Sequence, residues 1–513
     1  MRKRILLTIT AAVLTALSLP GMGLSLTIWF SLAILLFALT GVSHRRGFLL
    51  GLLFGLFYYS IAFWWLLPAF VREIPNTFQS FPPIVGFFVY ILGAFFLSLY
   101  FGVFGLLFVF GEKRYQKRST SNWKKEVFVL IWVPLLLYFV EYLRSLPPLK
   151  FIGMRFSDSL FSMNGIIQLA SFGGTEMLVL IIGFINALIF FYLRKRPLRK
   201  PRTIITILLI ITSIYTTDSI IASFLPAPYV DNSHSITVAG AQTMMTPLNK
   251  YYSTEEELLT DLDSMIVESS AEAPELFVLP ETYFLFNIAH YPRSTETLES
   301  LSNQYGVHIV APHIIDSEEK TYNAVRLVSP EEGVGEKFYG KRELNPFTEY
   351  IPFEKLFGFL SFLQLRSYLD SGPEPSVFEV EDFKMSFPIC FEAFFPSVFI
   401  EQKQRGAQVF CVISNDGYFT HSVALEQHFR QLQMRAVETR SWVCHVSNNG
   451  ITGLVDPYGR IIQSSVPFER SISYFDIPYQ KPEKTFYSSS RNIILIVLLT
   501  AFIACFIFLF MIK

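Results

Sequence analysis

The sequence of 513 residues is poor in charged side chains. Asp, Glu, Lys and Arg make up 16% of it and hydrophobic residues 51%, whereas a soluble domain has about 25% charged residues. The 42 basic and 42 acidic residues balance, so no excess charge indicates a nucleic-acid partner. Residues 1–223 and 492–512 are strongly apolar, while 225–490 has the composition of a globular domain. Composition therefore predicts a membrane protein with one large domain outside the bilayer.

Cysteine is also scarce. The four cysteines are Cys390, Cys411, Cys444 and Cys505, and none forms a CxxC motif, which argues against a structural zinc site or a redox pair. Cys411 and Cys444 lie in apolar, strand-like runs where free thiols are common. We therefore expect no disulfide between them, although the sequence leaves one open. The chain has no Gly-rich phosphate loop and no dinucleotide fingerprint, and we expect neither a cofactor nor a metal.

Eight apolar segments are each near the ~20 residues that cross a bilayer. The first, which follows a basic start, is also compatible with a signal peptide, but the spans that follow at once favour a membrane helix. We expect seven helices in 1–224, a globular domain in 225–490 and a last helix in 491–513. The segments lie at about 5–19, 24–42, 48–70, 83–111, 127–145, 174–193, 203–224 and 492–512.

Lys and Arg concentrate in alternate loops. Three precede the first span, two lie in 43–47, and six lie in each of the loops 112–126 and 194–202. Each loop between these contains two or fewer. Because positively charged loops stay in the cytoplasm, both termini are predicted to be cytoplasmic and the globular domain extracytoplasmic. A reaction there has no ATP or reduced nicotinamide to draw on.

Within 225–490, strand-like runs alternate with helical ones, which is typical of a layered α/β fold. Three polar residues each follow a predicted strand: Glu281 after 275–280, Lys341 after 334–340 and Cys390 after 384–389. A thiol becomes a nucleophile when a base takes its proton and a positive charge favours the anion. Cys390 also precedes a helix predicted at 394–405, and a helix N-terminus favours a lowered thiol pKa. Taken singly, each residue has an ordinary alternative, as a core thiol, a helix cap or a solvated lysine.

In this order, Glu281, Lys341 and Cys390 resemble the Glu-Lys-Cys triad of the nitrilase superfamily. The segment 341–352, Lys-Arg-Glu-Leu-Asn-Pro-Phe-Thr-Glu-Tyr-Ile-Pro, is similar to a loop of its membrane branch, the apolipoprotein N-acyltransferases. The layout of seven spans, outer domain and one last span is also similar. Further segments that match the pattern are 413–416, 427–428, 434–438 and 447–450. The sequence departs from it at Met244, Phe391, Tyr418 and Thr420, where the family usually has Asn, Tyr, Trp and Gly.

The resemblance implies an αββα sandwich beside a helical bundle in the bacterial inner membrane. Glu281 would be the general base and Cys390 the nucleophile, while Lys341 and the N–H of Phe391 would stabilise the oxyanion. A phospholipid would donate an acyl chain, and the amine of the diacylglyceryl cysteine of an apolipoprotein would accept it. One alternative is a membrane-tethered carbon–nitrogen hydrolase acting on a small amide. Another is a non-catalytic membrane scaffold that kept the fold, although the intact triad argues against it. The resemblance also implies two supporting carboxylates, Glu349 and Glu392.

Two aromatic segments suggest how lipid reaches a polar site. One is 353–363, and the other, just past Cys390, contains Phe391, Phe394, Phe395 and Phe399. Our hypothesis is that they dip into the outer leaflet and gate the entry of acyl chains. Ordinary core packing is the equally weighted alternative.

Overall fold

The computed structural model describes residues 1–78, 81–116, 122–147, 150–195, 201–227, 234–316, 319–358, 361, 369–420, 422–481 and 483–511. The chain divides into two compact units. One comprises Met1–Val71, Pro82–Leu225 and Ser489–Lys513, and the other comprises Arg72–Phe81 and Pro226–Ser488. Each unit is described by itself below.

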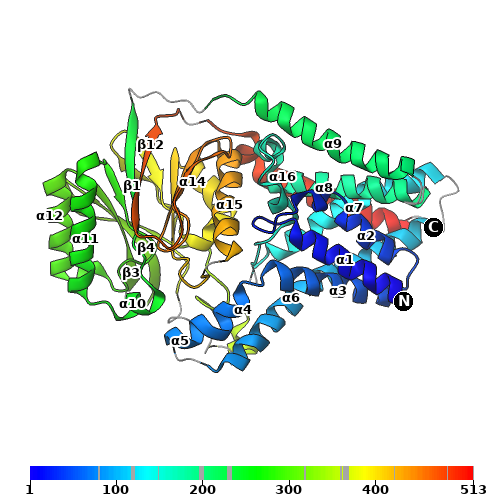
Figure 1. Cartoon of the computed structure of the whole chain (residues 1–513), viewed down its shortest axis with the longest axis horizontal. Helices are drawn as coiled ribbons and strands as arrows, with labels where there is room; N and C mark the ends of the chain where they lie inside the picture. Colours follow the sequence, from blue (N-terminus) through cyan, green and yellow to red (C-terminus); the bar gives the residue numbers. More distant parts are fainter. Residues whose placement is uncertain are drawn as a thin grey trace. The chain divides into compact units, whose positions relative to one another are not determined.

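The first unit is helical (Figure 1). All eight segments predicted to span a membrane contain helix: α1 (Arg2–Leu17), α2 (Ile28–Leu39), α3 (His44–Ala62), α6 (Pro83–Gln116), α7 (Asn122–Arg144), α8 (Ala170–Lys195), α9 (Pro201–Ser223) and α16 (Phe486–Met511). Within the described residues, five helices are long and apolar enough to cross a bilayer. A sixth span results if α3 and the helical segment Leu66–Asn76, bent by 76°, count as one. Helices α1 and α2, with 16 and 12 residues, are shorter than the ~20 residues of a typical span.

Glycines let α3 and α6 approach closely. Gly47, Gly51 and Gly55 recur every four residues and lie on one face of α3. A Cβ atom at Gly51 would lie 2.0 Å from the carbonyl oxygen of Phe101, and one at Gly55 would lie 2.7 Å from the Cα of Ser98. Small residues at this spacing are typical of helix packing in membranes, where close backbone contact replaces the hydrophobic effect.

The second unit contains two six-stranded sheets, with strand orders β12-β1-β2-β3-β4-β5 and β11-β10-β9-β8-β7-β6. Strands are present in the three runs that were predicted to end before Glu281, Lys341 and Cys390. Strand β11 is a short and largely exposed partner of β10. The first sheet comprises β1 (Ser235–Gln242), β2 (Leu276–Val278), β3 (His308–Asp316), β4 (Thr321–Ser329), β5 (Gly333–Gly340) and β12 (Ser471–Pro478). The second comprises β6 (Phe378–Val380), β7 (Phe383–Ser386), β8 (Val409–Ser414), β9 (Trp442–Ser447), β10 (Gly453–Val455) and β11 (Ile461–Ser464).

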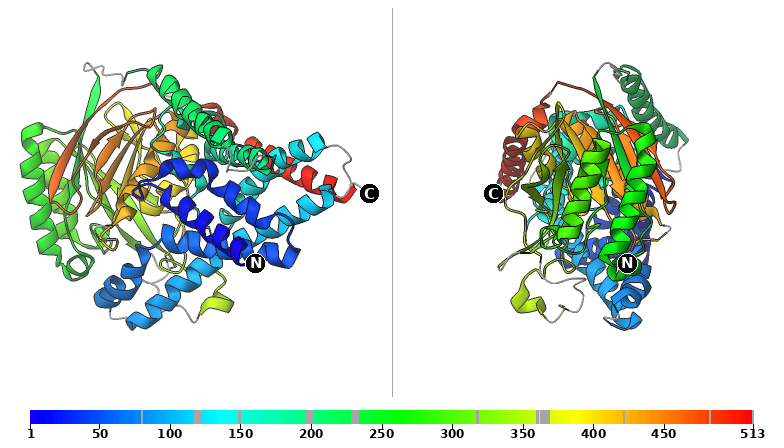
Figure 2. Two further views of the ribbon diagram at one scale, coloured as in Figure 1. Left: turned by 45° about the vertical axis from the view of Figure 1, so that its right-hand side comes forward. Right: turned by 90° about the vertical axis from the view of Figure 1, so that its left-hand side faces the viewer.

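The sheets lie face to face between two helical layers, which confirms the predicted sandwich (Figures 1 and 2). Helices α11 (Glu255–Ser269) and α12 (Pro292–Tyr305) cover one outer face, and α14 (Pro396–Gln404) and α15 (Val423–Thr439) cover the other. Apolar side chains from both sheets form one core, among them Val278, Tyr339 and Cys411. Cys411 lies opposite Cys444 in the β8–β9 pairing, yet both thiols are free, as predicted.

Candidate active site

Strand directions bring the ends of β2 and β5 to one edge of the first sheet. Strand β2 runs parallel to β3, and β5 runs antiparallel to β4, which is itself antiparallel to β3. Strands β2 and β5 therefore point the same way, so Glu281 and Lys341 follow them at the same edge. In the second sheet β7 and β8 are parallel, and Cys390 and Asn415 follow their carboxyl ends.

A buried ammonium lies between two carboxylates. The Nζ atom of Lys341 donates to Oε1 of Glu349 at 2.8 Å and to Oε1 of Glu281 at 3.4 Å. The Lys341 side chain is fully buried, and those of Glu281 and Glu349 are 8% and 15% exposed. Burial alone would lower the pKa of Lys341, but the two carboxylates raise it above its usual range. Lys341 is therefore a permanent cation in this site.

The carboxylate of Glu281 is held by two further donors. Nδ2 of Asn323, on β4, donates to Oε1 at 2.8 Å, and the backbone N–H of Asn415 donates to Oε2 at 3.0 Å. Neither contact could be predicted from the sequence, because Asn323 lies inside β4 and Asn415 follows β8 in the other sheet. The amide of Asn323, directly before the apolar pair Ala324 and Val325, was the available signal for that residue.

The nucleophile candidate lies at a sharp turn of the backbone. Cys390 has φ of 51°, in the left-handed region that L residues seldom adopt. It begins a short 3₁₀ turn, Cys390–Phe394, and α14 starts only at Pro396. Strain of this kind clusters at functional sites, where surrounding contacts hold the conformation in place.

The expectation of a lowered thiol pKa is wrong. Burial raises the pKa of Cys390 well above its ordinary value, and Glu281 raises it further, while Lys341 opposes the shift. No long helix begins at Cys390, so little helix dipole acts on the sulfur. The residue rests as a neutral thiol and needs a base to become nucleophilic.

Glu392 ties the Cys390 turn to the segment that carries Lys341. Its buried carboxylate accepts from the N–H of Ile389 at 2.7 Å, the N–H of Arg342 at 2.8 Å and the hydroxyl of Tyr339 at 2.8 Å. Burial raises the pKa of Glu392 to about 7, and these hydrogen bonds limit the rise. The structure therefore gives Glu392 a bracing position between two site segments.

The aromatic side chains that follow Cys390 are mostly packed inside the domain. Phe391, Phe395 and Phe399 are 8%, 4% and 0% exposed, and Phe399 packs against Phe410 of β8. The alternative of core packing is therefore confirmed for Phe395 and Phe399. In the segment 353–363, Phe353 is 51% exposed, while 359–360 and 362–363 lie outside the described residues, so the gate there stays a hypothesis.

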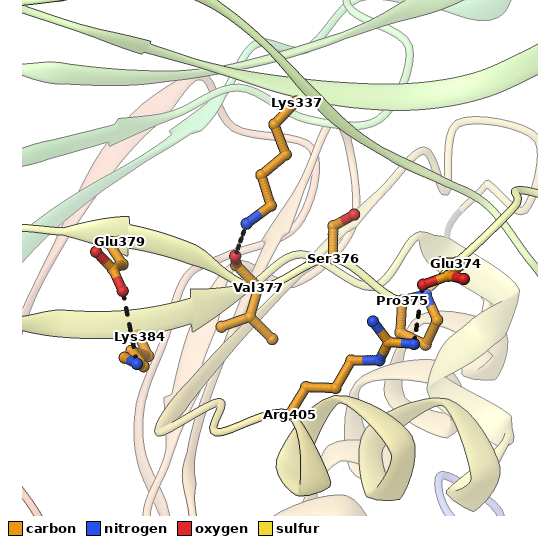
Figure 3. Close-up of a pocket in the computed structure, with 8 residues that line it drawn as sticks. All are labelled: Lys337, Glu374, Pro375, Ser376, Val377, Glu379, Lys384 and Arg405. Carbon is orange, nitrogen blue, oxygen red and sulfur yellow. Dashed lines mark hydrogen bonds and ion pairs between the residues drawn. The ribbon is translucent and has the colours of Figure 1, made fainter.

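A second hollow in this unit has a volume of about 540 Å³ and contains none of the triad residues (Figure 3). Its three cations each have a partner: Lys337 donates to the carbonyl of Val377, Lys384 pairs with Glu379 at 3.5 Å, and Arg405 pairs with Glu374 at 3.1 Å. A pocket whose charges are already paired has little capacity to hold an ionic ligand. The candidate active site is therefore the one around Lys341.

Comparison with known proteins covers both units. The model "Apolipoprotein N-acyltransferase N-terminal domain" matches residues 11–188, and the model "Carbon-nitrogen hydrolase" matches 236–485. The apolipoprotein N-acyltransferase of Thermotoga maritima is 32% identical over 94% of this chain and 89% of its own length. The apolipoprotein N-acyltransferase of Geobacter metallireducens is 26% identical over 92% of this chain and 88% of its own length.

Among solved structures, an amidase from Nesterenkonia sp. aligns with 52% of this chain and 96% of its own. The sequence identity is 17% and the TM-score is 0.39.

Proposed function

This chain belongs to the apolipoprotein N-acyltransferase family, and from that premise we propose that Glu281, Lys341 and Cys390 carry out its acyl transfer. The protein is a bacterial membrane enzyme that acylates lipoproteins. The observation that carries the proposal is the buried Lys341, which lies between Glu281 and Glu349. Its positive charge also acts on the Cys390 thiol and opposes the rise in pKa that burial causes there. A buried, fixed cation next to a base suits reactions that pass through an oxyanion.

The first half-reaction would load the enzyme. Glu281 takes the proton from the Cys390 thiol, and the sulfur attacks the carbonyl carbon of a phospholipid acyl ester, most simply the one at sn-1. The new C–S bond produces a tetrahedral oxyanion, which Lys341 and the N–H of Phe391 stabilise. The ester C–O bond then breaks, the glycerol oxygen takes the proton back from Glu281, and a lysophospholipid leaves. An acyl thioester stays on Cys390.

The second half-reaction would transfer the acyl group from Cys390 to the acceptor amine. The neutral α-amine of a diacylglyceryl cysteine attacks the thioester carbonyl, and Glu281 accepts the proton that the nitrogen releases. The C–S bond breaks, and the thiolate regains its proton from Glu281. Because an amide is more stable than a thioester, the exchange proceeds without ATP, which agrees with an extracytoplasmic position of the domain.

The charges in the site are consistent with Glu281 acting as the base in both half-reactions. Cys390 rests as a thiol because burial and carboxylates raise its pKa, so nucleophilicity arises only when Glu281 removes the proton. Lys341 stays charged and so offers the oxyanion a cation rather than competing for the proton. Glu349 holds Lys341 from the other side at 2.8 Å, and we assign it that supporting role.

Location and substrates complete the proposal. The basic loops support a catalytic unit outside the cytoplasm, and we propose that it lies at the inner membrane with both termini inside. The donor is then a phospholipid of the outer leaflet and the acceptor is a diacylglyceryl apolipoprotein.

Intact-protein mass spectrometry after incubation with phospholipid tests this function. Wild type should gain the mass of one acyl chain, hydroxylamine should remove it, and Cys390→Ala should gain none. Glu349→Gln serves as a matched variant that keeps the triad, and should load more slowly but to the same mass. If wild type acquires no adduct from any phospholipid, the transferase mechanism fails and a hydrolase acting on a small amide becomes the better account.

A further inference from the structure

A buried imidazole contacts the backbone of the nucleophile. Nε2 of His428, on α15, donates to the carbonyl oxygen of Cys390 at 3.0 Å. Its Nδ1 lies 2.8 Å from Oδ1 of Asp416, which follows β8. The side chains of His428 and Asp416 are 7% and 0% exposed. The catalytic scheme above uses neither of them.

Its two partners fix the protonation of this ring. A backbone carbonyl can only accept a hydrogen bond, and so can an ionised carboxylate. Both ring nitrogens must therefore carry hydrogen, which makes His428 an imidazolium. Asp416 also accepts from the hydroxyl of Ser447 at 2.7 Å, which favours its ionised form.

The surrounding charges agree with this assignment. Burial would lower the pKa of His428, but the negative charge of Asp416 raises it above its usual value. Burial would raise the pKa of Asp416, but His428 holds it below its ordinary range. The ring of His445 lies 5.2 Å from that of His428, and burial lowers the pKa of His445 to about 4, so it is neutral. Glu281 also favours the charged form of His428.

The contact has a geometric consequence for the next residue. The carbonyl of Cys390 and the N–H of Phe391 belong to one planar peptide group and point in opposite directions. Holding the carbonyl against His428 therefore sets the direction in which the Phe391 N–H points. A hydrogen bond from a cation to one end of a peptide also polarises its other end, which strengthens the N–H as a donor.

We propose that His428, held by Asp416, is a positioning residue that aims and polarises the Phe391 N–H toward the oxyanion of both half-reactions. This inference rests on the proposed triad and deepens it. The bond to His428 is one of the contacts around the Cys390 backbone, whose φ of 51° is left-handed.

A metal ion is the competing use of the same side chains. Ligand atoms of Asp416, His428 and His445 lie within 4.8 Å of one another. Metal binding needs a ring nitrogen with a free lone pair, whereas His428 uses both nitrogens as donors. Both ring nitrogens of His445 also have partners: Nδ1 donates to the carbonyl of Ile451 at 2.7 Å, and Nε2 lies 2.6 Å from the hydroxyl oxygen of Ser414. The hydrogen bonds therefore favour positioning over metal binding.

The test compares two reactions of the same thiol. Acyl transfer from phospholipid passes through an oxyanion, whereas alkylation by iodoacetamide is a displacement that forms none. The double variant His428→Phe/Asp416→Asn removes the donor without leaving a buried charge unpaired. The rate of its single-turnover acylation should fall about 10- to 100-fold. This is no more than the rate loss that follows removal of a whole oxyanion donor. Its alkylation rate should stay within about twofold, because alkylation forms no oxyanion for the Phe391 N–H to stabilise.

Two single variants separate the effect of the direction of the Phe391 N–H from the effect of the positive charge on His428. His428→Gln and Asp416→Asn can each keep a neutral donor near the Cys390 carbonyl, so both should recover part of the lost acylation rate. His313→Gln is the matched control, because His313 is also fully buried and its Nδ1 lies 2.9 Å from a backbone carbonyl, that of Ala311. It should leave the ratio of acylation to alkylation unchanged. Treatment with EDTA or added zinc should not change wild-type acylation.

Each outcome decides the question. Unchanged acylation in the double variant, or equal falls in acylation and alkylation in all His428 variants, overturns the positioning role. Loss of wild-type activity in EDTA that zinc restores replaces it with a metal site. If wild type forms no thioester at all, both the proposed function and this inference fail. If wild type forms the thioester normally and the double variant does so at the same rate, only this inference fails.

Discussion

Replacing Asn323 by Asp places a second carboxylate against the proposed general base. In the wild type, Nδ2 of Asn323 donates to Oε1 of Glu281 at 2.8 Å, and the side chain is buried. Asn323→Asp changes the shape by one atom and turns that donor into an acceptor. Two carboxylates at this distance cannot both be ionised without strong repulsion, so they share a proton.

The size of the effect follows from the distance. The centres of two carboxylates whose oxygens are in contact lie about 4 Å apart, and at an effective dielectric constant of about 20 their charges repel by about 4 kcal/mol. At about 1.4 kcal/mol per unit, this moves the ionisation of the pair by about 3 pH units. Lys341, 3.4 Å from Glu281, offsets part of the repulsion, so 3 units is an upper bound.

The assay is single-turnover acylation of Cys390 from phospholipid, measured by intact mass between pH 5 and pH 10. A shared proton occupies the base, so the variant should acylate slowly at pH 7. Its rate should recover as the pH rises, with the acid limb of the profile displaced upward by about 1 to 3 units. Asn303→Asp adds the same charge at an exposed position of the same unit and should leave the profile unchanged.

An unchanged pH profile would exclude Glu281 as the base. If Asn323→Asp is folded and its pH profile overlays that of wild type, Glu281 does not act as the base. A fall in rate that is equal at every pH would point instead to a disturbed site geometry.

Three further predictions concern stability and are checked by thermal unfolding in detergent. Gly51→Ala should destabilise the α3–α6 contact by about 1–3 kcal/mol, because its Cβ would meet the Phe101 carbonyl, whereas Gly93→Ala, with open space at its Cβ, should be tolerated; equal effects would contradict the close packing. Met244→Asn should raise stability by about 1 kcal/mol, because Met244 has φ of 62° and Asn tolerates that conformation; a loss of stability would count against it. Lys403→Met should raise the unfolding temperature at pH 7, because burial lowers the pKa of Lys403 from 10.5 to about 8. The folded state then binds fewer protons between pH 8 and 10.5, so the cost of the charge, about 3 kcal/mol, is present below pH 8 and fades above it. A gain independent of pH would contradict this.

The strands of the catalytic unit could be predicted because their signal is local. The apolar run in 275–280 is followed by the polar residue Glu281, and the structure has β2 there. Strand β11 was missed because only one end of it is partly buried, which leaves a weak pattern. The number of spans was harder to predict, since α1 and α2 are apolar but short.

In the candidate active site, too, some features could be predicted from the sequence and others could not. Glu281, Lys341 and Cys390 were candidates because each follows a strand, and their roles stay predictions that the experiments above test. The pKa of Cys390 could not be read from the sequence, because burial and the approach of Glu281 depend on the packing of two sheets. The bond between Asp416 and His428 connects elements that only the fold brings together, so it could not be predicted from the sequence.

The most direct measurement is the fate of the isolated acyl-enzyme. Wild type loaded with phospholipid and freed from excess lipid is mixed with a diacylglyceryl-cysteine peptide, and both masses are followed. The account predicts that Cys390 loses one acyl chain as the peptide gains one as an amide, and that the thioester persists when peptide is absent. A thioester that water discharges equally fast, with no acylated peptide, would contradict a transferase built on Glu281, Lys341 and Cys390.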